Sequence, residues 1–311
     1  MGENYRKKGG KLEMLVCDGI TKSFDAFTAV EDVSFTVEDG SICGLVGYNG
    51  AGKTTLLKIA ASIYRPDKGG FLFDGKLSTG EEKTRQEIFL LPDVFYYLPQ
   101  ATLRSMAAFY SGYYPTWSVD TYHKLLELFD LEEKTRIQRF SKGMQRQAYL
   151  AIALACQPHY LLLDETFDGL DPSKRNLVRR ILMEYIAEKE ACVLLASHNL
   201  PELENLCDHI VILNEKKVAF DCSMDDIGRD IRKYRLVFRQ PVKEEQFHGL
   251  DYRRFSQDGG VISLMIRGDE ETAEAALRAL EPVLLESFPL SLEEVFLYEM
   301  EEKRYDLTGL F

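Results

Sequence analysis

The feature that most constrains this 311-residue chain is a glycine-rich loop between an apolar run, Ile42–Val46, and a helical run that begins at Thr54. Strand, loop and helix in this order form the context in which the pattern G-x-x-x-x-G-K-T binds phosphate. The glycines let successive backbone N–H groups point inward, and the helix N-terminus adds its positive end. The loop therefore predicts a nucleoside triphosphate site. Its residues are Gly47, Tyr48, Asn49, Gly50, Ala51, Gly52, Lys53, Thr54 and Thr55.

A second motif is an apolar run that ends in two acids, Asp164 and Glu165. A buried strand with this ending places both carboxylates at the carboxyl edge of a parallel sheet, where the phosphate loop also lies. There the Lys53 ammonium is predicted to reach phosphate oxygens, while the Thr54 hydroxyl and Asp164 hold Mg²⁺. Glu165 is predicted to orient and deprotonate the attacking water.

Strand-like and helical runs alternate on both sides of these motifs. This alternation predicts a parallel-centred, three-layer α/β domain over residues 14–230, interrupted by a helical insert at about 94–147. Residues 1–13 are interpreted as a flexible basic tail. Residues 231–311 are predicted to form a small α+β domain, whose last helix begins with the capping-box pair Ser291 and Glu294.

Composition excludes some functions without choosing one. The formal net charge of −12 argues against a general nucleic-acid surface, so no nucleic-acid partner is expected. The sequence contains no run of 18 uncharged apolar residues, so no segment is predicted to span a bilayer. The six cysteines include no C-x-x-C pair, and they predict reduced thiols in a cytosolic protein.

A segment before the acidic strand carries a resemblance. Phe140–Gln145 is similar to the Leu-Ser-Gly-Gly-Gln signature of ATP-binding cassette (ABC) transporters, and the chain from about Leu15 to Asp221 resembles their nucleotide-binding subunit. The resemblance implies an ABC fold with an antiparallel β part, and it implies ATP and Mg²⁺ as cofactors. It also implies that Ser141, Gly143 and Gln145 contribute to binding an ATP held by an opposite subunit.

Other family elements follow from the resemblance. Asp171, after Gly169-Leu170, resembles the D-loop aspartate at the subunit interface. His198 follows a buried strand and matches the switch histidine that contacts the γ-phosphate. Phe24 matches the aromatic residue that stacks on adenine, with a strand-edge phenylalanine buried in the core as the alternative.

One position departs from the family pattern. Asp93 stands where the family has a glutamine after a strand, and Gln100 is the other candidate for that role. We favour Asp93, which can accept a hydrogen bond from a magnesium-bound water but cannot donate one when it is ionised.

The helical insert is rich in aromatic residues, a composition enriched in partner-binding surfaces. In the family, a membrane subunit docks beside this insert. The aromatic residues are Phe95, Tyr96, Tyr97, Phe109, Tyr110, Tyr113, Tyr114 and Trp117.

The resemblance implies an ATP-hydrolysing subunit that powers transport, with export as the expected direction, through a separate integral membrane permease. It further implies pairing with a second ABC ATPase subunit, identical or related, and a location on the cytoplasmic face of the membrane. The alternative is a soluble ABC ATPase that acts on ribosomes or DNA-repair complexes, but this chain has one cassette and no long heptad run. An inactive scaffold is disfavoured by the intact Lys53, Asp164 and Glu165.

Overall fold

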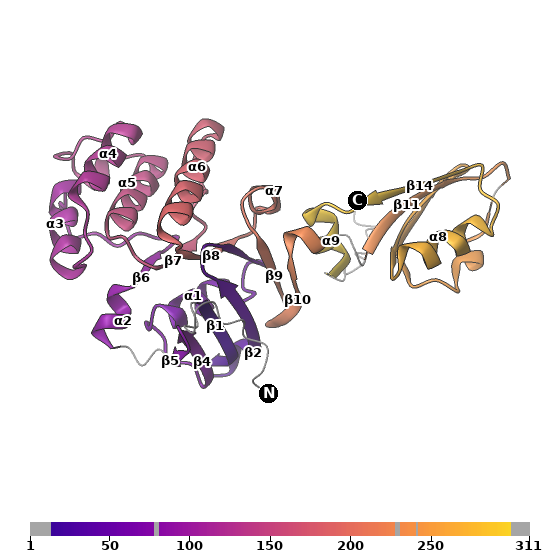
Figure 1. The fold of residues 1–311 in the computed structure, drawn as a ribbon, viewed down its shortest axis with the longest axis horizontal. Coiled ribbons are helices and arrows are strands. Elements are labelled where there is room, and N and C mark those ends of the chain that lie inside the picture. The colour runs from indigo at the N-terminus through magenta and orange to yellow at the C-terminus, as the bar shows by residue number, and fades with distance from the viewer. Residues whose placement is uncertain (1–13, 78–80, 228–230, 241, 300–311) are drawn as a thin grey trace, which may run out of the picture. The chain divides into compact units, whose positions relative to one another are not determined.

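The computed structural model describes residues 14–77, 81–227, 231–240 and 242–299. The chain divides into two compact units (Figure 1). The first unit comprises residues 1–199 and 205–221, and the second comprises residues 200–204 and 222–311. The predicted tail, residues 1–13, lies outside the described residues.

A six-stranded sheet forms the centre of the first unit, with the strand order β10-β9-β3-β8-β7-β6. Neighbouring strands from β9 to β6 pair in parallel. Every residue of β3, β7 and β8 is buried, which is why these strands are continuous apolar runs in the sequence. The strands are β3 (Ile42–Val46), β6 (Ile88–Leu91), β7 (Tyr160–Asp164), β8 (Cys192–Ser197), β9 (His209–Asn214) and β10 (Lys217–Ser223).

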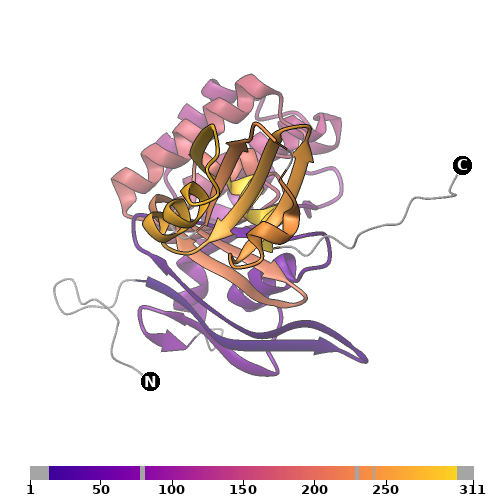
Figure 2. The same ribbon diagram turned by 90° about the vertical axis from the view of Figure 1, so that its right-hand side faces the viewer.

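A second, antiparallel sheet has the order β2-β1-β4-β5, and the long hairpin of β1 and β2 is the indigo ribbon in the lower part of Figure 2. Helix α1 (Lys53–Ala60) contributes Leu56 and Leu57 to one apolar core shared with strands of both sheets. The strands are β1 (Met14–Phe24), β2 (Phe27–Glu38), β4 (Lys68–Phe73) and β5 (Lys76–Leu77).

The remaining helices of the first unit include the predicted insert, and α3 to α6 gather on one side in Figure 1. Thr102 and Ser118 cap α3 and α4 with their side-chain oxygens, as expected for hydroxyl residues before a helix. Most of α5 is buried. The helices are α2 (Glu82–Gln86), α3 (Leu103–Tyr113), α4 (Val119–Phe129), the 3₁₀ turn η1 (Ile137–Arg139), α5 (Lys142–Ala155) and α6 (Pro172–Lys189).

The second unit is an antiparallel sheet with the order β12-β13-β11-β14, and one of its faces packs on α8 (Figure 2). The capping box predicted for the last helix is confirmed: Glu294 N–H donates to Ser291 Oγ at 3.2 Å, and Ser291 N–H donates to Glu294 Oε2 at 3.1 Å. The elements are α7 (Leu200–Glu204), η2 (Met224–Asp226), β11 (Ile231–Val237), η3 (Glu244–Phe247), β12 (Tyr252–Asp258), β13 (Val261–Arg267), α8 (Glu270–Arg278), β14 (Leu284–Pro289) and α9 (Leu292–Glu299).

The predicted fold class is confirmed: a parallel-centred sheet, an antiparallel sheet and a helical insert form the first unit. The sequence patterns did not indicate β10 or β12, whose residues are exposed or only partly buried, so neither strand has a strong apolar face. The predicted boundary between residues 230 and 231 stays a prediction.

An ion pair at the start of β7 gives the fold a pH dependence. His159 Nε2 lies 3.1 Å from Asp39 Oδ1, and this hydrogen bond raises the pKa of His159 while burial opposes the rise. Because the folded pKa exceeds the unfolded value of about 6.5, the pair stabilises the fold below that pH, and the contribution is lost as pH rises through the folded pKa. We therefore expect His159→Gln to lower the urea midpoint at about pH 5.5 and to change it little at about pH 9. An equal loss at both pH values would contradict the assignment.

Candidate nucleotide-binding and catalytic site

The carboxyl ends of four parallel strands bring the predicted site residues together. Val46 pairs with Ser197, Asp164 with Ala196, and Leu91 with Leu163, so β3, β8, β7 and β6 end at the same edge of the sheet. The residues that follow these ends are the phosphate loop, His198, Glu165 and Asp93. The site is therefore assembled by strand register, as expected for an open parallel sheet.

Gly52 fixes the turn from the phosphate loop into α1. Its φ is +107°, a conformation that side chains rarely adopt, and an added Cβ would lie 2.3 Å from Val30 Cγ1 and 2.7 Å from the Ala29 carbonyl oxygen. Only glycine fits at this position. The following residue, Lys53, is the first of α1, and no side chain caps the helix there, so its first N–H groups face the loop.

Lys53 is the buried cation of the site. Its side chain is 6% exposed, Nζ donates to the Gly47 carbonyl at 2.6 Å, and Nζ lies 3.8 Å from Glu165 Oε1. Burial lowers the pKa of Lys53, while the carboxylates of Glu165 and Asp164 oppose that shift. A phosphate group would give this desolvated ammonium a further anionic partner.

Asp164 and Thr54 supply oxygen ligands of the kind that Mg²⁺ takes. Thr54 Oγ1 donates to Asp164 Oδ2 at 2.8 Å, and Asp164 Oδ1 is buried without a partner among the described residues. Burial raises the pKa of Asp164; the bond from Thr54 opposes this, and the charges of Glu165 and Asp93 add to it. An unpaired buried oxygen surrounded by further acids fits a hard divalent cation, so the residues present fit Mg²⁺.

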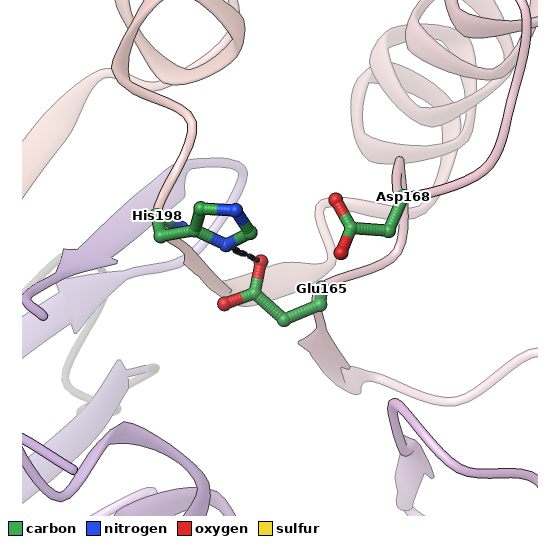
Figure 3. Close-up of side chains that lie close together, drawn as sticks. All are labelled: Glu165, Asp168 and His198. Carbon is green, nitrogen blue, oxygen red and sulfur yellow. Dashed lines mark hydrogen bonds and ion pairs between the residues drawn. The ribbon is translucent and has the colours of Figure 1, made fainter. Parts of the chain in front are cut away.

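Glu165, His198 and Asp168 form a compact group beyond the ends of β7 and β8 (Figure 3). His198 Nδ1 lies 2.9 Å from Glu165 Oε2, and one ligand atom of each of the three residues falls within 4.8 Å of the others. Glu165 has φ +48°, an uncommon conformation for a non-glycine residue, and its N–H donates to the Ala196 carbonyl at 2.9 Å. The tight turn after β7 thus aims the carboxylate at His198. Sequence reasoning missed Asp168, although its place three residues after Glu165 in the same loop was a usable signal.

The signature residues lie at the start of α5. Ser141 Oγ accepts a hydrogen bond from Met144 N–H at 3.2 Å, so Ser141 is the N-cap of α5. Gln145 Nε2 donates to two carbonyls of its own chain, which fixes the entry to the helix. A Cβ on Gly143 would lie 2.9 Å from the Gly169 carbonyl oxygen. The structure thus brings the signature and the D-loop together, while their predicted contact with a partner's ATP stays a prediction.

The other predicted residues lie farther out. Asp171 caps α6 by accepting hydrogen bonds from Ser173 N–H and Lys174 N–H, each at 3.0 Å. The hydrogen bond from the Ser173 hydroxyl is the main cause that lowers the pKa of Asp171, and the two backbone N–H bonds add to it. Phe24 is 38% exposed and stacks edge-on against Tyr64 with ring centroids 5.3 Å apart, so it is not a core residue. Its stacking on adenine stays a prediction, as does the contribution of the exposed Tyr48.

Asp93 lies close enough to Asp164 for its charge to act on that carboxyl, and its Oδ1 accepts a hydrogen bond from Arg146 Nη2 at 2.7 Å. Gln100, the other candidate, lies in an exposed turn with φ +62°. These positions support Asp93 as the residue that takes the glutamine's place. Sequence reasoning missed Arg146, because nothing local marks a partner 53 residues away.

Comparison with known proteins gives the family. The ABC transporter family matches residues 30–168. The Nod factor export ATP-binding protein I of Rhizobium johnstonii is 30% identical over 309 residues, covering 93% of this chain and 96% of that protein. The chain belongs to the ABC transporter ATP-binding proteins. The ABC transporter ATP-binding protein YtrB of Bacillus subtilis is 29% identical over 289 residues, 92% of this chain and 97% of that protein.

Solved structures agree with this ABC ATPase assignment. A structure of an ATP binding subunit of an ABC transporter has a TM-score of 0.64 and 29% identity, covering 70% of this chain and 92% of that one. A nucleotide-free ATP-binding cassette, with a TM-score of 0.59 and 22% identity over 68% of this chain and 91% of that one, shows the same fold. The ABC ATPase therefore binds ATP and hydrolyses it to power transport. None of the helices within the described ranges combines the length and apolar character needed to cross a membrane.

Proposed function

We propose that this ABC ATPase hydrolyses Mg²⁺-bound ATP at the carboxyl edge of its parallel sheet. The observation that carries this proposal is the convergence of Lys53, Glu165 and His198 around the loop, with the unpaired Asp164 Oδ1 beside them. Lys53 binds phosphate oxygens. Thr54, Asp164 and Asp93 would hold a magnesium ion, which would neutralise charge at the phosphates.

Two groups act on the reacting water and phosphate. Glu165 is the general base: it takes the proton of the attacking water, and its orientation is fixed by His198 Nδ1 at 2.9 Å. The exposed His198 imidazole then contacts the γ-phosphate. Each ATP is enclosed between two subunits, which are two copies of this chain or two related chains. The phosphate loop of one subunit binds the ATP, and Ser141 and Gly143 at the start of α5 in the other subunit close over it.

The work of this ATPase is transport through a separate integral membrane permease, with export as the direction. Two observations support export. Two relatives matched over 90% and 93% of this chain are Nod factor export ATP-binding proteins. The closing segment Ser291–Phe296 resembles the C-terminal segment of many bacterial export-type subunits, and Ser291 caps its helix. The protein then lies on the cytoplasmic face of the membrane, held there by the permease.

A patch of aromatic and aliphatic side chains is the proposed permease contact. Phe109 is 61% exposed, Ile63 is 59% exposed and Tyr113 is 37% exposed. Ile63 and Tyr113 line an open hollow of about 240 Å³. Phe109 lies beside it, with its ring centroid 5.4 Å from that of Tyr110, another lining residue. By contrast, Tyr114 donates to the Ile88 carbonyl at 2.8 Å and belongs to the core. The hollow is lined by Ala61, Ile63, Arg85, Ile88, Phe89, Leu90, Tyr110, Tyr113 and Tyr114.

Phe109→Glu is expected to reduce recovery of the membrane partner by at least about 10-fold, because a buried charge replaces an aromatic anchor. The measurement is co-purification of a polytopic membrane protein with tagged protein from detergent-solubilised native membranes, with ATP and Mg²⁺ present. Leu128→Glu, on α4, is the matched control because Leu128 is also an exposed apolar residue of the insert. Both variants should keep the ATPase rate of the isolated protein. Equal recovery with both variants would remove the patch from the interface, and recovery of ribosomal or repair proteins alone would contradict the transporter function.

A further inference from the structure

An ion pair ties the loop after β6 to the signature helix α5. Arg146 Nη2 donates to Asp93 Oδ1 at 2.7 Å. The two partners differ in environment, since the Arg146 side chain is 9% exposed and the Asp93 side chain is 50% exposed. The guanidinium therefore lies in the protein interior, while the Asp93 carboxylate is half exposed and its charge acts on Asp164. Arg146 bonds to Asp93 Oδ1 only, so Asp93 Oδ2 is available to contribute to binding a second cation.

Further contacts hold the same loop to α5. The Arg146 guanidinium lies 5.6 Å from the centre of the Phe95 ring, and Phe95 stacks on Tyr149 with centroids 4.3 Å apart and planes 9° apart. The Tyr149 hydroxyl also donates to the Tyr96 carbonyl oxygen. Arg146 and Tyr149 are both on α5, so the segment from Asp93 to Tyr96 is fastened to that helix by an ion pair, a ring stack and a hydrogen bond.

The guanidinium depends on Asp93 for its charge partner. Arg146 Nη1 is buried and has no hydrogen-bond partner among the residues the structure describes. Moving Asp93 away would leave this buried cation without an ion-pair partner among the described residues, which is strongly unfavourable. Asp93 is therefore expected to keep its bond to Arg146 when its other oxygen contributes to the magnesium site. A glutamine in this place would carry no charge and could not hold Arg146 in this way.

We propose that Arg146 is a positioning residue of the ATPase site. It orients the Asp93 carboxylate toward the magnesium site and links that carboxylate to α5, the helix that begins next to Ser141. Occupation of the magnesium site and the placement of the signature helix are then coupled through one ion pair. This inference rests on the proposed role of Asp93 in holding Mg²⁺.

The test is a double-mutant cycle on metal affinity. Mn²⁺ replaces Mg²⁺ as the probe, and its binding in the presence of a non-hydrolysable ATP analogue is measured by electron paramagnetic resonance. Arg146→Gln is expected to weaken Mn²⁺ binding roughly 10-fold, the size of effect typical when a group that orients a metal ligand is lost. Asp93→Ala, which removes every side-chain oxygen at this position, is expected to weaken it by a similar factor, and the double variant should be no weaker than Asp93→Ala alone.

Controls separate positioning from a general loss of stability. Arg104→Gln removes another ion pair of the insert, that of Arg104 with Glu133 at 2.8 Å, and should leave Mn²⁺ affinity unchanged. Arg146→Lys keeps a positive charge and should recover part of the affinity lost in Arg146→Gln; it also serves if the glutamine variant does not fold. An Arg146→Gln effect of equal size with and without Asp93 would overturn the proposal. Unchanged affinity in Asp93→Ala would also overturn it. If the unmodified protein did not hydrolyse ATP at all, the proposed function would be overturned instead.

Discussion

Glu165→Gln is expected to keep ATP affinity and to slow hydrolysis by about 10²- to 10⁴-fold, the usual contribution of a positioned general base. The amide has nearly the shape of the carboxylate and can still bond to His198, but it cannot accept the proton of the attacking water. The measurement is steady-state phosphate release at saturating ATP, together with nucleotide binding by fluorescence.

The variant has a second expected property. With ATP bound and not hydrolysed, two copies should stay together and elute as a dimer in size-exclusion chromatography. Glu188→Gln on α6 is the matched control, since Glu188 is an exposed glutamate of the same unit and should leave rate and elution unchanged. Hydrolysis by Glu165→Gln at the rate of the unmodified protein would remove Glu165 from the role of base.

Lys53→Met is expected to weaken ATP binding about 10- to 100-fold, because hydrogen bonds to charged groups contribute about 1.5–3 kcal/mol each. Methionine fills a similar volume without a charge, so the buried position stays packed while the phosphates lose their cation. Isothermal titration with ATP and Mg²⁺ gives the affinity, and a thermal melt of the nucleotide-free protein reports folding.

Lys58→Met provides the comparison. Lys58 lies in the last turn of the same helix, with Nζ 5.4 Å from the centre of the Tyr64 ring and away from the phosphate loop. Its loss should leave ATP affinity within about twofold, as is usual for a surface substitution. If both lysine variants bound ATP equally well, Lys53 would not be the phosphate-binding cation.

Local patterns explain what could be predicted from the sequence. The phosphate loop, the acids at the end of β7 and the Ser291 capping box are each encoded within a few residues. The order of strand, loop and helix along the chain fixes where the loop and the acids lie. Because the strands are parallel and in register, placing one motif at the carboxyl edge of the sheet also placed the others. The fold class and the residues at the sheet edge followed from that.

Long-range or irregular features could not be predicted. The pairing of Asp93 with Arg146 joins two elements with no sequence relation, and it depends on how α5 packs beside β6. Strand β12 carries a register shift between Arg253 and Ser256, and Arg254 has φ +51°, so its side chains do not alternate as a regular strand requires. Tertiary packing, not local preference, decides such features.

The close approach of Gly143 to Gly169 has a mechanical consequence. With a Cβ position only 2.9 Å from the Gly169 oxygen, no side chain can be accommodated between the start of α5 and the turn that leads into α6. When two backbone segments are in direct contact, a displacement of one displaces the other, because no flexible side chain between them can adjust its conformation. The starts of the two helices should therefore move together, so a displacement beside Glu165 after hydrolysis should also displace the surface proposed to meet a second subunit.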